Sequence, residues 1–256
     1  MPGECVQDFP RRSLRGASMA HATLDLMKEA KHETSVSSRK IIHEILPVGM
    51  LQCNCSIVGD TQTREALVID PGDEVSRILE LLRKHQFTVK AIVSTHAHID
   101  HVGGLRKLRE ATGAPVFMHA DDLELYNALE RQAGWLGMPT PGITEVDTFL
   151  KEGDFLRWGP FEARVLHTPG HTRGSLSLYL PQNADRVTLA APQLFAGDTL
   201  FAGSIGRTDL WGGSFEDIMR SIRLKLLELP DETVVFPGHG PATTIGQERE
   251  TNPFLK

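Results

Sequence analysis

The sequence predicts an α/β protein built as a four-layer αββα sandwich, with two β-sheets packed face to face and helices outside. Short runs of β-forming residues alternate with amphipathic helical segments in both halves of the chain. Each half can therefore form a sheet with one helix-covered face, and the two sheets can bury their other faces against each other. In addition, the histidine-bearing segments follow predicted strands, where loops converge at one edge of a sheet.

The first half opens with three predicted strands, at residues 41–46, 53–58 and 66–69. The Gly59-Asp60 step before the third strand favours a hairpin. After the Pro71-Gly72 break we expect a helix over residues 74–85, because its apolar residues recur at helical spacing: Val75, Ile78, Leu79 and Leu82.

The rest of the first half continues the alternation. Residues 89–94 are almost wholly apolar, which is typical of a strand covered on both faces. We expect helices over residues 104–111 and 121–131, with a short strand at 116–118 between them. The Gly- and Pro-rich residues 134–142 predict a loop.

The second half carries more strands than helices. Strands are predicted at residues 161–166, 175–180, 187–189 and 233–236, and Phe195 leads into a further strand that ends at Gly197-Asp198. Ser214 is suited to cap a helix that reaches Leu229, because the apolar positions between them keep the helical period.

Residues 1–38 differ from the remainder in composition. Three arginines and several serines are faintly similar to a transit peptide, but five acidic residues contradict that interpretation, and a secretory apolar core is absent from the sequence. We predict a poorly ordered N-terminal extension over residues 1–38 and one folded domain over residues 39–256.

Composition argues against two classes of partner. The formal net charge is −6 and the sequence has no long basic run, so we expect no nucleic-acid binding. No run of eighteen apolar residues is present, so we expect no membrane span. The sequence does not indicate an oligomeric state.

The three cysteines do not form a disulfide framework. Their number is odd, and Cys53 and Cys55 are separated by a single residue. We expect these two side chains to lie on opposite faces of a strand and to act as small apolar residues in a reducing compartment. This favours a cytoplasmic location.

The strongest functional signal follows the buried strand at residues 89–94. His96, His98, Asp100 and His101 place four metal-ligating side chains within six residues. Imidazole and carboxylate are ligands that Zn²⁺ and similar ions prefer. His96 and His98 can face one ion if the backbone curls, while Asp100 and His101 can face a second ion around the bend.

Two ions need more ligands than this segment supplies, and three other strand ends offer them. His171 lies in a Pro-Gly turn, Asp198 follows a glycine, and His239 stands between two glycines. Glycine lets the backbone approach a bound group closely. His167 competes with His171, but a spacing of four residues in a turn gives no shared face, so we exclude His167.

These segments as a set resemble the metallo-β-lactamase superfamily, and its glyoxalase II-like branch most closely. The resemblance covers about residues 41–256 and rests on residues 68–72, 96–101, 167–172, 197–201 and 236–241. It implies a first ion held by His96, His98 and His171. It implies a second ion held by the remaining ligands and bridged by Asp198: Asp100, His101 and His239.

The resemblance also concerns Asp70, which matches a family aspartate near the site. It implies that Asp70 orients a ligand histidine, while capping of the Pro71-Gly72 bend is an equally weighted alternative.

The charges of such a site favour hydrolysis. The positive charge of two divalent ions exceeds the negative charge of Asp100 and Asp198. A bound water would therefore ionise to a metal-bound hydroxide near neutral pH. We predict Asp100 as the catalytic residue besides its ligand role. The ions are predicted to be Zn²⁺, with Fe or Mn as alternatives.

The glyoxalase II-like resemblance implies a small-molecule thioester substrate of a 2-hydroxy acid, similar to S-lactoylglutathione. Arg207 aligns with a loop that carries a basic glutathione contact in that family, and we predict that Arg207 binds an anionic substrate group. A solvated surface arginine is the alternative.

The chain stops after the Asn252-Pro253-Phe254 motif, where family members continue into helices with further glutathione contacts. This departure weakens the expectation of glutathione specificity.

Three other functions remain open at this point. Similar motifs occur in persulfide dioxygenases, which bind one iron through counterparts of His96, His171 and Asp198. A β-lactam or lactone hydrolase is a second alternative, and a metal-binding module without activity is a third.

Overall fold

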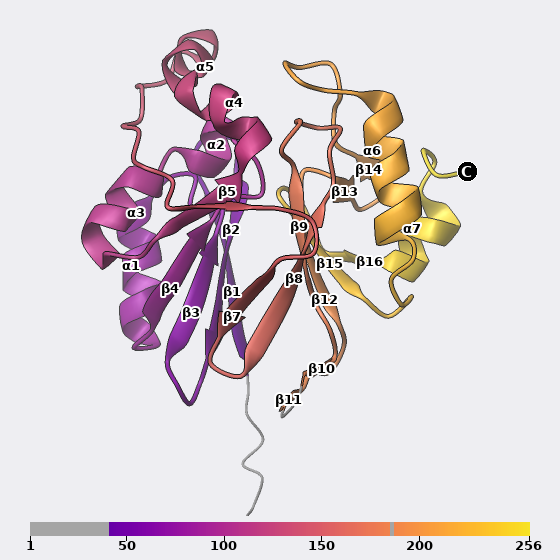
Figure 1. Cartoon of the computed structure of the whole chain (residues 1–256), viewed down its shortest axis with the longest axis horizontal. Helices are drawn as coiled ribbons and strands as arrows, with labels where there is room; N and C mark the ends of the chain where they lie inside the picture. The colour runs from indigo at the N-terminus through magenta and orange to yellow at the C-terminus, as the bar shows by residue number, and fades with distance from the viewer. Residues whose placement is uncertain (1–40, 185–186) are drawn as a thin grey trace, which may run out of the picture. The chain divides into compact units, whose positions relative to one another are not determined.

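The computed structural model describes residues 41–184 and 187–256. The predicted extension at residues 1–38 lies outside the described residues. The described part of the chain is the four-layer αββα sandwich that the sequence predicts, so the fold class is confirmed (Figure 1). No helix among the described residues is both long and apolar enough to cross a membrane.

The first sheet has the strand order β1-β2-β3-β4-β5-β6. The strands β1, β2 and β3 pair antiparallel, and the pairs from β3 to β6 are parallel. The strand bounds are Ile41–Val48, Cys53–Asp60, Glu65–Ile69, Thr88–Val93, Val116–His119 and Thr148–Leu150.

The second sheet has the strand order β16-β15-β12-β9-β8-β7. In chain order its strands are Phe155–Trp158, Phe161–His167, Leu176–Leu180, Gln193–Gly197, Val234–Pro237 and Thr243–Thr244. Two small hairpins are separate from it, β10 (Asn183–Ala184) with β11 (Val187–Thr188), and β13 (Leu200–Phe201) with β14 (Ser204–Ile205).

The helices cover the outer faces of the sheets. The first sheet packs against α1 and α3, and the second against α6 and α7 (Figure 1). The helix bounds are Val75–Lys84 (α1), Ile99–Val102 (α2), Leu105–Thr112 (α3), Leu123–Asn127 (α4), Leu129–Leu136 (α5), Phe215–Ser221 (α6) and Ile245–Thr251 (α7).

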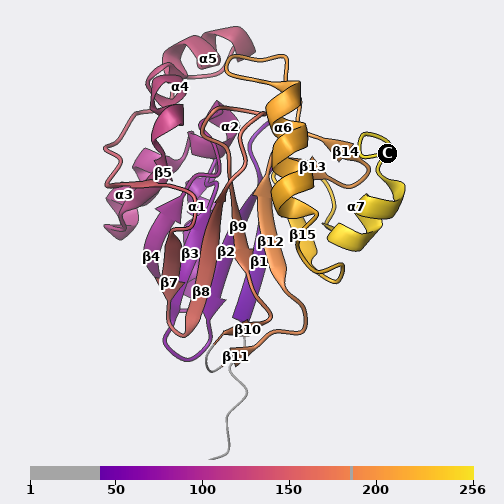
Figure 2. The ribbon, with the colours of Figure 1, turned by 45° about the vertical axis from the view of Figure 1, so that its right-hand side comes forward.

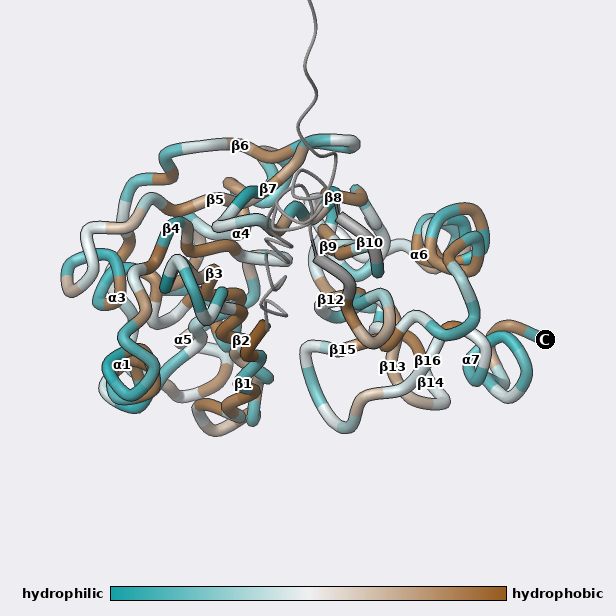
Figure 3. The backbone as a smooth tube through the Cα atoms, turned by 90° about the horizontal axis from the view of Figure 1, so that it is seen from below, coloured by the Kyte–Doolittle hydropathy of each residue, from teal (hydrophilic) through white to brown (hydrophobic). Residues whose placement is uncertain are grey.

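Alternation along the central strands explains the layering. Leu67 and Ile69 belong to the apolar layer between the two sheets, while Ala66 and Val68 belong to the layer beneath α1 and α3. A strand whose successive side chains feed two different apolar layers must be buried on both faces. Seen along the sheets, brown hydrophobic segments lie on the strands and teal hydrophilic segments on the outer helices (Figure 3).

Three local predictions are wrong. The helix over residues 121–131 is divided into a 3₁₀ turn (Ala120–Asp122), α4 and α5, with a break at Ala128. The loop at residues 134–142 begins later, because α5 continues to Leu136. Ser214 does cap α6 by accepting a hydrogen bond from Asp217 N, but α6 passes into a π-helical segment, Ile222–Leu226, and ends before Leu229.

The orientation of the two strand cysteines is also corrected. Cys53 and Cys55 both face the apolar layer beneath the helices and are fully buried as free thiols. Residues two apart on a strand share a face, so the expectation of opposite faces was wrong. The interpretation as small apolar core residues agrees with their burial.

His43 gives the fold a pH dependence that is independent of the site. Its ring lies edge-on against Phe195 and Phe236, and burial lowers its pKa to about 4. The unfolded chain binds a proton at this histidine below about pH 6.5, whereas the folded chain does so only near pH 4. The stability that neutral His43 contributes is thus present above pH 6.5 and is lost as the pH falls to about 4.

We therefore expect His43→Gln to flatten the pH dependence of unfolding. Between pH 7 and pH 4 the wild type should lose up to about 3 kcal/mol more of its free energy of unfolding than the variant. Urea unfolding followed by circular dichroism at several pH values measures this difference. Parallel curves for the two proteins would contradict the assignment, since other histidines titrate in both.

Candidate metal centre

All seven side chains that the sequence singles out lie together at one end of the two sheets. His96 and His98 lie in the loop between β4 and α2, and Asp100 and His101 lie on α2. The other three come from the second sheet, in the loops that follow β8, β12 and β15: His171, Asp198 and His239. Figures 1 and 2 place α2, α4, α5 and the start of α6 at this same end.

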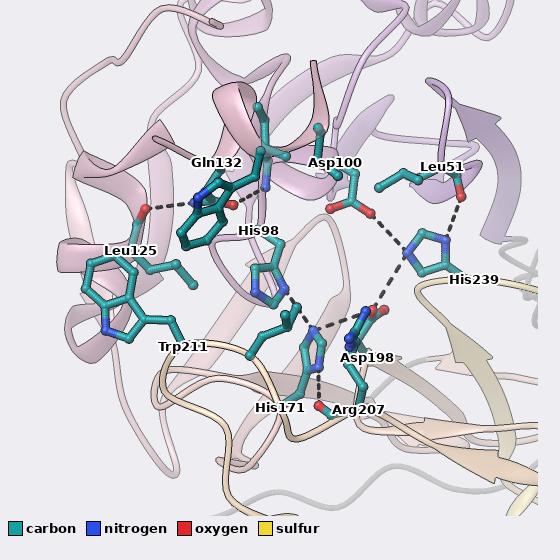
Figure 4. Close-up of a pocket in the computed structure, with 14 residues that line it drawn as sticks. Leu51, His98, Asp100, Leu125, Gln132, His171, Asp198, Arg207, Trp211 and His239 are labelled. Atoms are coloured by element: carbon teal, nitrogen blue, oxygen red, sulfur yellow. Dashed lines mark hydrogen bonds and ion pairs between the residues drawn. The ribbon is translucent and has the colours of Figure 1, made fainter. Parts of the chain in front are cut away.

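The seven residues form three overlapping groups, in each of which the potential ligand atoms lie within 4.8 Å of one another. The groups are His96 with His98 and His171, His96 with His101 and Asp198, and Asp100 with His101 and His239. The first and third groups are the two ligand sets that the family resemblance implies. Figure 4 shows the side chains of His98, Asp100, His171, Asp198 and His239 pointing toward one another.

Asp198 lies between these two sets. Its Oδ2 is 3.6 Å from His171 Nε2 in the first set and 3.7 Å from His239 Nε2 in the second. Its Oδ1 is 3.5 Å from His101 Nε2. A carboxylate with both oxygens facing two ligand sets has the placement of a bridging ligand.

Hydrogen bonds on the outer side of the rings orient two of the histidines. His171 Nδ1 donates to Arg207 O at 2.8 Å, and His239 Nδ1 donates to Leu51 O at 3.0 Å. A carbonyl oxygen only accepts, so each Nδ1 carries the proton. In the neutral ring Nε2 then presents its lone pair to the centre of the cluster.

Asp70 orients a third histidine. Its Oδ2 is 3.0 Å from His101 Nδ1, and the backbone N–H and the hydroxyl of Thr95 donate to the same carboxylate at 2.7 Å. Asp70 is buried and has a positive φ of 52°, a conformation uncommon outside glycine. Between the two interpretations of Asp70, these contacts favour orientation of a ligand histidine.

The inward-facing atoms have the character of a cation site. His101 Nε2 and His239 Nε2 lie 3.2 Å apart, although the outward contacts assign the ring protons to the Nδ1 atoms. Among the described residues, His96 Nε2 and Asp198 Oδ1 are buried without any hydrogen-bond partner. Lone pairs and carboxylate oxygens that face one another in this way favour a positive charge between them, and imidazole and carboxylate ligands suit a transition-metal ion. The residues therefore fit a metal ion.

Burial keeps two of these histidines neutral. It lowers the pKa of His96 well below its usual range and that of His98 to about 3, with the nearby His171 adding to both effects. Neutral imidazole is the form that binds a metal ion.

Two buried residues that the sequence analysis missed hold the ligand loops. Asp122 accepts hydrogen bonds from Ala97 N at 2.9 Å, from the Thr172 hydroxyl at 2.8 Å and from Gly174 N at 2.6 Å. It thus joins the loop that carries His96 and His98 to the turn that carries His171. Burial raises the pKa of Asp122, and these three hydrogen bonds oppose that effect.

Gln132 is the second of these residues. Its side chain accepts from Ile99 N at 2.9 Å and donates to Ala97 O at 3.1 Å. A sequence signal existed for it, because Gln132 shares the buried stripe of α5 with Leu129 and Ala133. For Asp122 the sequence offers only two acidic residues at a helix start, which normally indicates capping.

His167, which we exclude as a ligand, lies outside the seven-residue cluster. Its ring stacks on His119 with centroids 4.0 Å apart, and its Nε2 bonds to Arg173 O.

A pocket of about 510 Å³ opens beside the cluster, and five of the seven residues line it: His98, Asp100, His171, Asp198 and His239. The pocket wall is mostly apolar and includes Trp135, Trp211 and several leucines. Arg207, the predicted substrate contact, lines this pocket as well. Its guanidinium is paired with the Asp209 carboxylate at 2.7 and 2.8 Å.

Known proteins are similar to this chain in sequence and in fold. The family model of the metallo-beta-lactamase superfamily matches residues 48–239. An uncharacterized protein of Aquifex aeolicus is 45% identical, over 84% of this chain and 97% of that protein. Hydroxyacylglutathione hydrolase GloC of Haemophilus influenzae is 37% identical, over 83% of this chain and 97% of its own length.

Two solved structures agree with these matches. The BLEG-1 B3 metallo-beta-lactamase superposes with a TM-score of 0.75 at 38% identity, over 84% of this chain and 99% of that one. A di-iron-bound form of TTHA1623 superposes with a TM-score of 0.71 at 41% identity, over 83% and 100%. With the ligand geometry described above, these matches show that the chain belongs to the metallo-beta-lactamase superfamily of metal-dependent hydrolases.

Proposed function

We propose that the chain hydrolyses thioesters of 2-hydroxy acids. The observation that carries this proposal is the pair of ligand sets, joined by Asp198, beside an open pocket that members of both sets line. The substrate class is supported by the relative named hydroxyacylglutathione hydrolase, which the chain matches over nearly its whole length.

In the proposed reaction one water is consumed, a C–O bond forms at the thioester carbonyl, and the C–S bond breaks to give a carboxylic acid and a thiol. Two divalent ions would lower the pKa of a water molecule and polarise the carbonyl oxygen. We propose Zn²⁺, although the same ligands accept Fe or Mn.

The chain's own residues would act as metal ligands and as a proton carrier. One ion would be held by His96, His98 and His171, and the other by Asp100, His101 and His239, with Asp198 shared. Asp100 also lines the pocket. We propose that its carboxylate accepts the proton that the attacking water releases and delivers this proton to the departing sulfur.

One observation favours two ions over the single iron of a persulfide dioxygenase. Asp100 Oδ2 lies 3.2 Å from His239 Nε2 and 3.7 Å from His101 Nε2, so the ligand atoms of the second set lie close together, as those of the first set do. A one-iron site formed by His96, His171 and Asp198 would not need this set.

Purified protein of measured metal content, assayed with S-lactoylglutathione and with a β-lactam, tests the proposal. We expect about two metal ions per chain and thiol release that a chelator abolishes and added metal restores. One iron per chain with oxygen uptake on a persulfide would favour the dioxygenase, and β-lactam cleavage without thioester cleavage would favour the lactamase. Either result would overturn the thioesterase proposal.

A further inference from the structure

The pocket wall indicates what the substrate carries beside its reacting bond. Resting on the proposed thioester hydrolysis, we infer that the preferred substrate bears an uncharged apolar group on its thiol rather than the charged glutathione moiety. Five apolar side chains that line the pocket would bind this group, and together they form the apolar wall: Leu51, Trp135, Leu136, Leu210 and Trp211.

The apolar wall leaves large hydrophobic side chains in contact with solvent. Trp135 is 62% exposed, Leu136 41% and Leu51 41%. They border the same pocket as His98, Asp100 and Asp198, and Figure 4 shows Trp211 and Leu51 on different sides of these residues. An exposed apolar patch that is continuous with a reaction centre is typical of a binding site for an apolar ligand group.

One arginine contacts both tryptophans of the apolar wall, which come from different halves of the chain. The Arg131 guanidinium lies 4.9 Å from the ring centroid of Trp135 on α5 and 5.4 Å from that of Trp211, in the loop before α6. Cation–π contacts of this kind favour this placement of the two indoles. Arg131 does not itself line the pocket.

The charges of the pocket disfavour glutathione as a thiol. Glutathione carries two carboxylates, which need basic partners. Among the described residues that line the pocket, Arg207 is the single arginine or lysine, and its guanidinium already makes two hydrogen bonds to Asp209. A substrate carboxylate would have to displace Asp209, whereas an apolar thiol needs no such exchange.

The test compares two lactoyl thioesters that differ only in the thiol, S-lactoylglutathione and the thioester of benzyl mercaptan. Rates are corrected for hydroxide-catalysed hydrolysis of each compound. We expect kcat/KM for the benzyl compound to be at least about 10-fold higher, a gain of the size that one additional methylene contact gives. We expect Trp211→Ala and Trp135→Ala to reduce that ratio by about 10-fold, and Trp211→Phe to restore much of it.

Leu224→Ala serves as the matched control, because Leu224 is 67% exposed and does not line this pocket. It should leave the ratio unchanged. The inference would be overturned if S-lactoylglutathione were hydrolysed as fast as the benzyl compound or faster. It would also be overturned if the tryptophan variants slowed hydrolysis of both compounds alike while their circular dichroism and metal content stayed unchanged. If the metal-loaded wild type cleaves neither compound, the proposed function itself has failed.

Discussion

Asp198→Ala should abolish hydrolysis almost completely. Asp198 is the residue that faces both ligand sets, with Oδ2 3.6 Å from His171 Nε2 and 3.7 Å from His239 Nε2. In the proposed two-ion site its loss would remove one ligand from each ion, and it would leave the neighbouring histidines without the negative charge between them. We expect kcat to fall by at least about 10³-fold, the equivalent of roughly 4 kcal/mol of lost electrostatic stabilisation.

The measurement is a thioester assay together with metal analysis of the same sample. We expect the variant to bind fewer ions per chain than the wild type after identical loading. Asp231→Ala is a suitable control, because Asp231 is 67% exposed and its partner is the surface residue Arg249. Near-normal activity of Asp198→Ala would remove the basis for the bridging role.

Asp122→Asn should have the next largest effect. The carboxylate accepts three hydrogen bonds that join two ligand-bearing loops. An amide can accept at one oxygen only, so its NH₂ group would face a backbone N–H donor at a fully buried position. We expect the free energy of unfolding to fall by about 3 kcal/mol and kcat to fall by about 10- to 100-fold.

Asp121→Asn is the matched control for this variant, since Asp121 is the adjacent residue and is exposed. Urea unfolding, metal titration and the thioester assay should be run on both proteins. A loss of stability without any loss of metal affinity would mean that Asp122 supports the fold but does not position the ligands.

The candidate site was more predictable than some of the structure around it. His96, His98, Asp100 and His101 follow one buried strand, so four ligands are adjacent in the sequence as well as in space. The three distant ligands are marked by neighbouring glycines. Gly238 shows why: an added Cβ would lie 2.1 Å from Asp198 Oδ1 and 2.7 Å from His101 Cε1.

The missed features depend on contacts that have no local signal. The helix break at Ala128 lies within a continuous helical pattern in the sequence. The edge strands β6 and β7 were not predicted, because both are short and each has an exposed aromatic residue, Phe149 and Phe155. Asp122 resembles an ordinary residue of a helix start, because its partners come from segments 25 and 50 residues away. Such residues become recognisable only when the loops are seen together.

The division of the first ligand set between the sheets has a consequence for assembly. His96 and His98 lie in the loop that follows β4 of the first sheet, and His171 lies in the loop that follows β8 of the second. A cation bound by all three would act as a crosslink that forms only after the two sheets have met. The folded form would then gain roughly 4 kcal/mol at an ion concentration a thousand times the dissociation constant. Removing the ion with a chelator should accordingly lower the melting temperature of the whole sandwich, and a chain truncated before His171 should bind the ion poorly.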